Sequence, residues 1–384
     1  MRDKFLVFGQ PLIEQPEINE VVISLKSGWL GTGPKVQKFE GMFRAYKGIK
    51  YAMALNSCTA ALHLSILALG INPGDEVIVP TMTFAATANV VIHSGGIPVF
   101  VDCEKNTMNI DPEDIKRKIT PKTKALIAVH FAGRPCNMDA IMDIGKKNNL
   151  KIVEDCAHAV ESEYHGEKAG TIGDIGCFSF YVTKNIVTGE GGMAITDNED
   201  YANMIKMMGL HGMSKDAWKR FSDSGYKHYQ VLYAGYKYNM MDIQAAIGIH
   251  QLPRVDKYWE RRQEIWNQYN EAFKDLPVFT PAPVESNTRH AYHLYTLLLD
   301  IDKLNITRDD FLNEMTKKNI GVGVHYIALH LHPYYKKMFG YKWGDFSNAE
   351  WISSRTVSIP LSAKLSNEDV KDVINTVSET VSKR

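Results

Sequence analysis

Three residues whose side chains could act on one cofactor follow one another within a short stretch of the chain. Asp155 ends an apolar run, Ser179 lies in the next one, and Lys184 follows in a loop before the glycine-rich residues 189–192. Burial among apolar residues disfavours the ammonium form of a lysine, and the free amine can form an imine with an aldehyde. An acid can keep the ring nitrogen of pyridoxal phosphate protonated, which makes the ring a strong electron sink. The order and residue types therefore favour a pyridoxal phosphate site, with Asp155 beneath the ring and Lys184 as its Schiff-base lysine.

The cofactor phosphate and ring would need further contacts. Residues 56–59 read Asn-Ser-Cys-Thr and directly precede the apolar residues 60–69, so hydroxyls and amides converge at the positive end of an expected helix. Ser179 could add a hydroxyl, and Phe84, at the end of an expected strand, could stack on the pyridine ring. Plainer explanations stay open: helix caps for the Ser, Thr and Asp residues, a core role for Phe84, and a surface position for Lys184.

Short β-rich runs alternate with stretches of helical spacing from about residue 55 to residue 200. This alternation is typical of a mostly parallel sheet covered by helices. The strand runs are largely apolar, as in strands buried on both faces. The expected strands are residues 76–80, 98–102, 125–130, 151–154, 177–180 and 193–196, and the expected helices are 57–69 and 138–149. The sequence therefore predicts an α/β fold.

A smaller α+β part is expected after residue 253. Residues 242–252 and 258–273 have helical spacing, and Pro253 ends the first of these helices. Beyond them the patterns predict strands at 292–298, near 321–325 and at 357–361, a helix capped by Thr307, and a closing helix after Ser366 with Asp369 in a capping position. Because 384 residues exceed the size at which one core keeps growing, we expect a large domain at 1–253 and a small C-terminal domain at 254–384.

Composition and motifs argue against several other functions. Lys and Arg (44) balance Asp and Glu (44), so no broad basic field for nucleic acid or an anionic membrane is expected. The absence of a secretory or membrane-spanning apolar run and the unpaired spacing of five cysteines predict a cytoplasmic protein without structural disulfides. Neither a GxGxxG turn nor a GxxxxGK[ST] loop occurs, which disfavours a dinucleotide oxidoreductase or an NTPase. No metal site is expected either, because no acid or cysteine has matching spacing to the histidines near residue 330.

Taken together, the motifs resemble those of the DegT/DnrJ-type sugar aminotransferases, which are pyridoxal phosphate enzymes of fold type I, the aspartate-aminotransferase-like fold. The likeness runs nearly from end to end, with the motifs in family order. They are residues 27–35, 56–62, 154–158, 178–185, 189–192, 235–239, 242–248, 289–295, 323–326 and 358–361. Two departures concern the phosphate site: many members have Asn and Arg where this chain has Lys237 and Asn239, and Cys58 stands where glycine is common.

The resemblance implies a role for each matched residue. Lys184 would hold the cofactor and act as the catalytic residue, and Asp155 would pair with the ring nitrogen. The other cofactor contacts would be Cys58, Thr59 and Ser179 at the phosphate, Phe84 on the ring, His158 near it, and Lys237 at the phosphate of the partner subunit in a homodimer with shared active sites. The substrate contacts would be Thr32, Lys35, Asn185, His325 and Tyr326. For His325, packing or solvent exposure is an equal alternative.

The resemblance also implies a reaction and its rivals. The expected enzyme moves an amino group from glutamate, through pyridoxamine phosphate, to C4 of a nucleotide-linked 4-keto-6-deoxy hexose, with a UDP-linked N-acetyl sugar as the expected acceptor. A pyridoxal-phosphate-dependent keto-sugar dehydratase is the nearest rival, but relatives of that kind replace the lysine with histidine. A non-catalytic sensor that kept the fold for binding would be favoured by loss of Lys184 or Asp155, and both are present.

Overall fold

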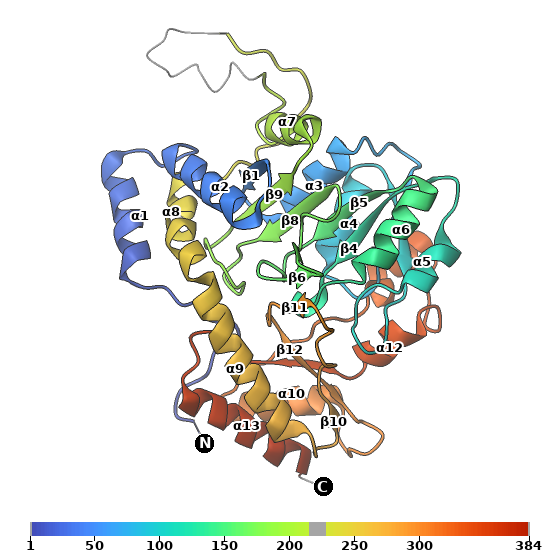
Figure 1. Cartoon of the computed structure of the whole chain (residues 1–384). Helices are drawn as coiled ribbons and strands as arrows, with labels where there is room; N and C mark the ends of the chain where they lie inside the picture. Colours follow the sequence, from blue (N-terminus) through green and yellow to red (C-terminus); the bar gives the residue numbers. More distant parts are fainter. Residues whose placement is uncertain (1, 215–227, 383–384) are drawn as a thin grey trace.

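The structure is a computed structural model that describes residues 2–214 and 228–382. Figure 1 shows an upper part built around a central sheet and a lower part in which both chain ends lie. The long helix α9 (Val255–Phe273) runs from one part to the other. Within the described ranges, no helix combines the length and apolar character needed to span a bilayer.

The central sheet has seven strands and is mostly parallel. Its order is β1-β9-β8-β5-β4-β2-β3. Strands β3, β2, β4, β5 and β8 run parallel, whereas β9 pairs antiparallel with both β8 and β1. The bounds are β1 (Tyr51–Leu55), β2 (Glu76–Pro80), β3 (Ile97–Val101), β4 (Thr123–Val129), β5 (Lys151–Asp155), β8 (Ile175–Ser179) and β9 (Gly192–Thr196). The predicted α/β fold with a mostly parallel sheet is confirmed.

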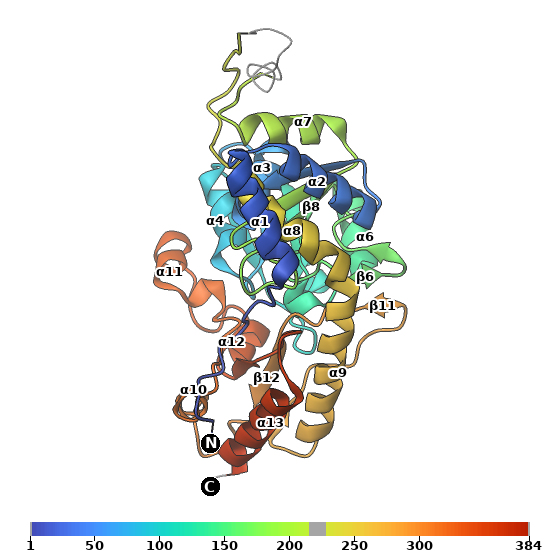
Figure 2. The same cartoon turned by 90° about the vertical axis from the view of Figure 1, so that its left-hand side faces the viewer.

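Helices cover both faces of this sheet, because alternate residues of each strand bury apolar side chains on opposite sides. In β1, Met53 and Leu55 join the apolar cluster beneath α3 (Cys58–Ala68), α4 (Ala85–His93) and α7 (Glu199–Met208), whereas Ala52 and Ala54 face the other side. That side is covered by α2 (Pro34–Lys47), α8 (Asp242–Gln251), α5 (Pro112–Lys118) and α6 (Met138–Asn148). Helix α1 (Gln15–Ser27) packs on α8 at the outside, as Figure 2 shows.

The lower part is built on a three-stranded antiparallel sheet in the order β10-β12-β13. Helices α9, α10 and α13 bury their apolar sides against it in one cluster. A further small sheet, in the order β11-β6-β7, joins a lower-part strand to two strands of the upper part. The remaining bounds are β6 (Glu163–Tyr164), β7 (Glu167–Lys168), β10 (Val278–Phe279), β11 (Thr288–Arg289), β12 (Tyr295–Leu299), β13 (Thr356–Ile359), α10 (Arg308–Lys317), α11 (Pro333–Phe339), α12 (Ser347–Ser353), α13 (Asn367–Ser382), and the 3-10 turns η1 (Phe131–Gly133), η3 (Leu252–Arg254) and η4 (Leu329–Leu331).

Contacts cross the predicted domain boundary in both directions. Leu6, near the start of the chain, pairs with Ile320 and lies in the apolar cluster of the lower part. Conversely, Leu329, Tyr335 and Ile352, far beyond residue 253, lie in the apolar cluster of the central sheet. The division into 1–253 and 254–384 therefore stays a prediction.

Two of the differences between the predicted elements and the structure have a plain physical reason. The sequence patterns miss β1, because its Ala and Met residues lack the β-branched character of the other strands. The strand expected near 321–325 is reduced to an isolated bridge between Gly323 and Ser358, since glycine weakens a strand. The predicted start of α10 after the Thr307 cap is confirmed, because the Thr307 hydroxyl accepts the Asp310 amide (3.1 Å).

Candidate active site

The predicted acid, serine and lysine lie at one edge of the central sheet. Asp155 ends β5 and Ser179 ends the parallel neighbour β8, in which Cys177 stands opposite Asp155. Lys184 follows in the loop from β8 to β9, where its amide donates to the Tyr181 carbonyl (2.8 Å). Open α/β sheets bind ligands outside the carboxyl ends of their parallel strands. This edge of the sheet is therefore the candidate site.

Asp155 is a carboxylate buried at the end of β5. Its Oδ2 accepts the Thr87 hydroxyl (2.9 Å) from α4, and its Oδ1 accepts the Ala157 amide (3.1 Å). Burial raises the pKa of this carboxyl, while both hydrogen bonds and the charge of Lys184 act in the opposite direction. Because no cation in the described part of the chain forms an ion pair with Asp155, the carboxylate would be stabilised by a protonated ring nitrogen beside it.

Lys184 provides a reactive amine close to this carboxylate. Across the described ranges, no hydrogen bond or ion pair engages its Nζ. Burial lowers the pKa of Lys184 to about 8, although the negative charge of Asp155 opposes this. A lysine with such a pKa has a nucleophilic free amine near neutral pH.

A cradle for an anion lies at the start of α3, beside the end of β8. Ser57 caps α3: its hydroxyl accepts the Ala60 amide and its carbonyl accepts the Ala61 amide. Within the described chain, no group accepts a hydrogen bond from the amides of Cys58 and Thr59. Gly192 pairs with Ser179 across the sheet, and a Cβ added to Gly192 would meet the Cys58 nitrogen at 2.5 Å. Ser179 and the free end of α3 therefore face the same space, where the helix dipole favours a phosphate.

Aromatic side chains line the same region. Phe84 directly precedes α4 and is 63% exposed, so its ring can stack on a flat ligand. The Tyr326 ring lies 6.2 Å from it, and the Tyr326 hydroxyl is 3.3 Å from His158 Nε2. His158 Nδ1 accepts the Ala132 amide (3.2 Å), so the neutral imidazole carries its proton on Nε2 and donates to Tyr326. Burial lowers the pKa of His158 well below its usual value, and the charge of Lys184 adds to this effect.

Three predicted ligand contacts are tied to neighbours within the chain. The Thr32 hydroxyl accepts the carboxamide N–H of Asn239 (2.6 Å), and Lys35 forms an ion pair with Glu20 (2.6 Å). Lys237 is exposed, and its ammonium donates to the Asn239 carboxamide. Contact of Lys237 with a partner subunit, and of Thr32 and Lys35 with a sugar, stay predictions.

Asn185 and His325 are also engaged by the protein. The carboxamide of Asn185 makes hydrogen bonds with Glu161, Ala291 and His293. His325 Nδ1 lies 2.8 Å from the Ser358 hydroxyl, and burial lowers the pKa of His325 to about 4. This imidazole is therefore neutral at pH 7 and offers no positive charge to a diphosphate, so its predicted contact could only be that of a neutral hydrogen-bonding group.

Several residues that complete the site are missed by the sequence reasoning. Thr87 holds Asp155, and the His293 ring contacts the His158 ring in a tilted arrangement with centroids 4.4 Å apart. The position of Thr87, three residues after Phe84 at the start of a helix, is a sequence feature that could have suggested it. No pattern in the sequence links His293 to the cofactor residues, although it lies within the motif at 289–295.

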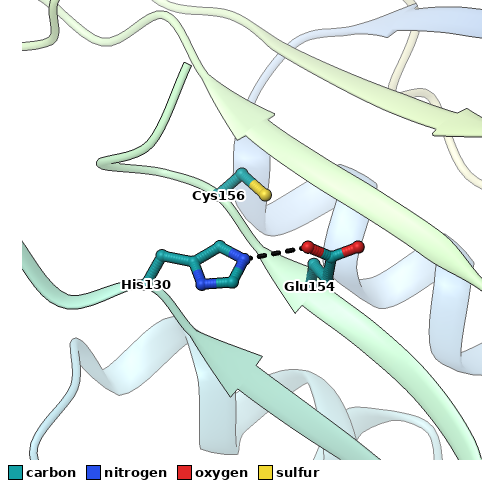
Figure 3. A group of neighbouring side chains, drawn as sticks. All are labelled: His130, Glu154 and Cys156. Atoms are coloured by element: carbon teal, nitrogen blue, oxygen red, sulfur yellow. Dashed lines mark hydrogen bonds and ion pairs between the residues drawn. The ribbon is translucent and has the colours of Figure 1, made fainter. Parts of the chain in front are cut away.

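A second polar group, on the opposite face of β5, is structural. Figure 3 shows His130, Glu154 and Cys156 close together, with the His130 ring directed at the Glu154 carboxylate. His130 Nδ1 accepts the Cys136 amide (3.0 Å) and its Nε2–H donates to Glu154 (2.9 Å), so the ring has no free lone pair for a metal. Glu154 also accepts three backbone amides from residues 170–173. This cluster anchors the loop after β5 rather than a cation.

The groups at the sheet edge fit pyridoxal phosphate. They provide a buried carboxylate for the ring nitrogen, an amine for the aldehyde, a helix end for the phosphate and an exposed aromatic ring for one face. A mostly parallel α/β sheet with such a donor set defines the class of fold-type I pyridoxal phosphate enzymes.

Comparison with known proteins places the chain within this class. Residues 11–378 match the model of the DegT/DnrJ/EryC1/StrS aminotransferase family. The chain is 53% identical to an uncharacterized protein of Methanocaldococcus jannaschii (100% of this chain, 99% of the relative) and 49% identical to the spore coat polysaccharide biosynthesis protein SpsC of Bacillus subtilis (99% and 98%). It superimposes with a TM-score of 0.91 on Spr1654 from Streptococcus pneumoniae, described as a sugar aminotransferase and solved in PMP and PLP forms (33% identity for the PMP form, 99% and 98% covered).

The chain belongs to the DegT/DnrJ/EryC1/StrS aminotransferase family. The predicted family, the predicted fold and the predicted class of enzyme, a pyridoxal-phosphate-dependent sugar aminotransferase, are thereby confirmed. The nucleotide on the sugar, the amino donor and the role of each residue lie beyond these comparisons.

Proposed function

We propose that this enzyme transfers the amino group of glutamate to C4 of a nucleotide-linked 4-keto-6-deoxy hexose, with a UDP-linked N-acetyl sugar as acceptor. The observation that carries the proposal is that a half-buried Lys184, whose amine has no hydrogen-bond or ion-pair partner among the described residues, lies with a buried carboxylate, Asp155, at one edge of the sheet. A dehydratase of this fold does not need that lysine, whereas amino transfer does.

The roles of the residues follow from their surroundings. Bound pyridoxal phosphate supplies an electron sink for the carbon that loses its proton. Asp155, held by Thr87, keeps the ring nitrogen protonated, and Ser179 with the Cys58 and Thr59 amides holds the phosphate. Lys184 Nζ holds the cofactor and, once released, takes up and returns the proton that moves during transfer. This requires its amine to be neutral for part of the time at physiological pH, as its lowered pKa allows.

The substrate class is supported by two features. A relative acts in spore coat polysaccharide biosynthesis and a structural neighbour is described as a sugar aminotransferase, which favours a sugar acceptor for this chain. Lys35 and Lys237 would serve its diphosphate; the Glu20 ion pair would have to open for Lys35 to do so. We also propose a cytoplasmic location for the enzyme.

We also propose a homodimer in which Lys237 reaches the cofactor phosphate of the partner subunit. Exposed apolar side chains gather on α1, on the segment after it, and on residues 231–241, which lie next to that segment through the Thr32–Asn239 hydrogen bond. They are Ile18, Val22, Ile23, Leu25, Trp29, Leu30, Val231, Leu232, Tyr233 and Met241. Exposed apolar surface of this extent is typical of a protein interface, and sedimentation analysis tests the expected dimer.

The test of the function is direct. Purified protein is incubated with pyridoxal phosphate, glutamate and a panel of keto nucleotide sugars, and 2-oxoglutarate release and product mass are measured. We expect 2-oxoglutarate and an amino sugar with at least one UDP-linked acceptor, and no turnover by Lys184→Ala. Lys371→Ala, at an exposed lysine of α13, is the matched control. Loss of water without gain of nitrogen would instead identify a dehydratase.

A further inference from the structure

A row of polar contacts connects α9 to the loop that carries Lys184. Arg262 of α9 forms a buried ion pair with Glu161. The second oxygen of Glu161 accepts an N–H of the Asn185 carboxamide (2.8 Å), and the carbonyl of Ala291 accepts the other (3.1 Å). The Asn185 carboxamide oxygen lies 2.9 Å from His293 Nδ1. Asn185 is therefore held from three sides, directly after the lysine in the chain.

These contacts determine where the proton of His293 lies. Carboxylate and carbonyl oxygens only accept hydrogen bonds, so both N–H groups of Asn185 are directed at Glu161 and Ala291. The carboxamide oxygen then faces His293, and the hydrogen between the two side chains must come from the imidazole. His293 thus carries its proton on Nδ1, and Nε2 of the neutral ring is a free acceptor.

The surroundings of His293 keep the ring neutral. Burial lowers the pKa of His293 well below its usual value, and the nearby charges of Lys184, His325, Arg262 and His290 act in the same direction. The His158 ring contacts it in a tilted arrangement, with ring centroids 4.4 Å apart. The negative charge facing this group, Glu161, is already paired with Arg262. An imidazolium at this position would therefore be unfavourable.

We propose that Asn185 is a positioning residue that holds His293 with its proton on Nδ1 beside His158, one of the predicted cofactor contacts. The inference rests on the proposed cofactor site. With its Nδ1–H donated to Asn185, the neutral His293 ring keeps an unprotonated Nε2 that can only accept a hydrogen bond.

This role differs from the sugar contact predicted for Asn185. The two N–H groups and the oxygen of its carboxamide are already used inside the protein, so the side chain has no free donor for a sugar hydroxyl. A sugar contact would change the KM for the keto sugar. A positioning role would change kcat and leave that KM unaltered.

The first measurement needs neither cofactor nor substrate. Apoprotein labelled with ¹⁵N-histidine is studied by long-range ¹H–¹⁵N correlation, in which protonated and unprotonated imidazole nitrogens have separate shifts, and His293→Gln identifies the His293 signals. We expect a protonated Nδ1 and an unprotonated Nε2 in the wild-type protein. Asn185→Leu should lose this fixed pattern. A proton on Nε2 in the wild type, or an unchanged pattern in Asn185→Leu, would overturn the proposal.

Asn109 offers a matched control. It is buried, and its carboxamide also donates to two carbonyls, those of Arg134 and Pro135, and accepts the Phe131 amide. Asn109→Leu should disturb packing to a similar degree yet keep the His293 pattern. If that pattern is lost in both leucine variants, the effect is not specific and the proposal fails.

Two further arms complete the experiment. Asn185→Asp, which keeps an oxygen acceptor, should retain the proton on Nδ1 even if Asn185→Leu does not fold; an unprotonated Nδ1 there contradicts the proposal. In the loaded enzyme, Asn185→Leu should lower kcat with an unchanged KM for the keto sugar. A normal rate in Lys184→Ala would instead refute the proposed function, while the ¹⁵N result for the apoprotein would still report on Asn185 and His293.

Discussion

Lys184 should react at lower pH than an ordinary lysine. Burial lowers its pKa from 10.5 to about 8, against the opposing charge of Asp155. At pH 7, roughly one Lys184 in ten then has a neutral amine, compared with about one in three thousand for a lysine at 10.5, an increase of ~300-fold. This increase is what the proposed role of the amine as nucleophile and base requires.

Competitive labelling of the apoprotein tests this prediction. A trace of an amine-reactive reagent is added at a series of pH values on both sides of pH 8, and peptide mass spectrometry measures the labelled fraction of each lysine. Labelling of Lys184 should rise with pH and level off above about pH 8. Lys371, exposed on α13, is the internal reference.

The variant Asp155→Asn tests the direction in which the Asp155 carboxylate shifts the pKa of Lys184. The Asp155 carboxylate favours the ammonium form of Lys184, so its removal should move the midpoint of labelling below pH 8. Asp256→Asn, at an ion pair with Arg289, is the control and should leave the midpoint in place. A wild-type midpoint near 10.5, or an upward shift in Asp155→Asn, would refute the reasoning.

Three further predictions concern buried polar groups. Glu161→Gln leaves the Arg262 guanidinium buried without its counter-ion and should lower the free energy of unfolding by ~3–5 kcal/mol in urea titrations. A loss under ~1 kcal/mol, as for an exposed ion pair, would contradict this prediction. Thr87→Val removes a donor to Asp155, so the pKa of that carboxyl should rise further, and the fall of kcat/KM on the acid side should move to higher pH than in the wild type. An unaltered pH profile would contradict the role of Thr87. Burial alone would raise the pKa of Glu154, but its hydrogen bonds lower this pKa overall, so the stabilisation that Glu154 gives at neutral pH should be lost as the pH falls below the usual carboxyl range. In Glu154→Gln, the temperature of thermal unfolding should therefore depend less on pH in acid than in the wild type. An equal dependence in both proteins would contradict this prediction.

The sequence alone determined the mostly parallel α/β fold and the main side chains of the cofactor site. Apolar runs at 151–154, directly before Asp155, and at 177–180, which contains Ser179, indicated parallel buried strands, and the carboxyl ends of parallel strands meet at one edge. The lysine in the following loop could be placed there without knowing the strand order. The start of α10 could also be predicted from the sequence, because the Thr307 cap is a contact between residues close in sequence.

Only the tertiary structure decided how the site is completed. The start of α3 approaches Ser179 because β9, late in the chain, is inserted between β1 and β8, an order that no local periodicity encodes. His293 contacts the ring of His158, which lies far from it in the sequence, and the carboxamide of Asn185 donates to Glu161 and Ala291. These contacts join residues far apart in sequence. Which group donates and which accepts in each hydrogen bond depends on burial and on which acceptors already have partners. Periodicity and residue type therefore gave the cofactor groups, while packing fixed the orientation and protonation of the groups around them.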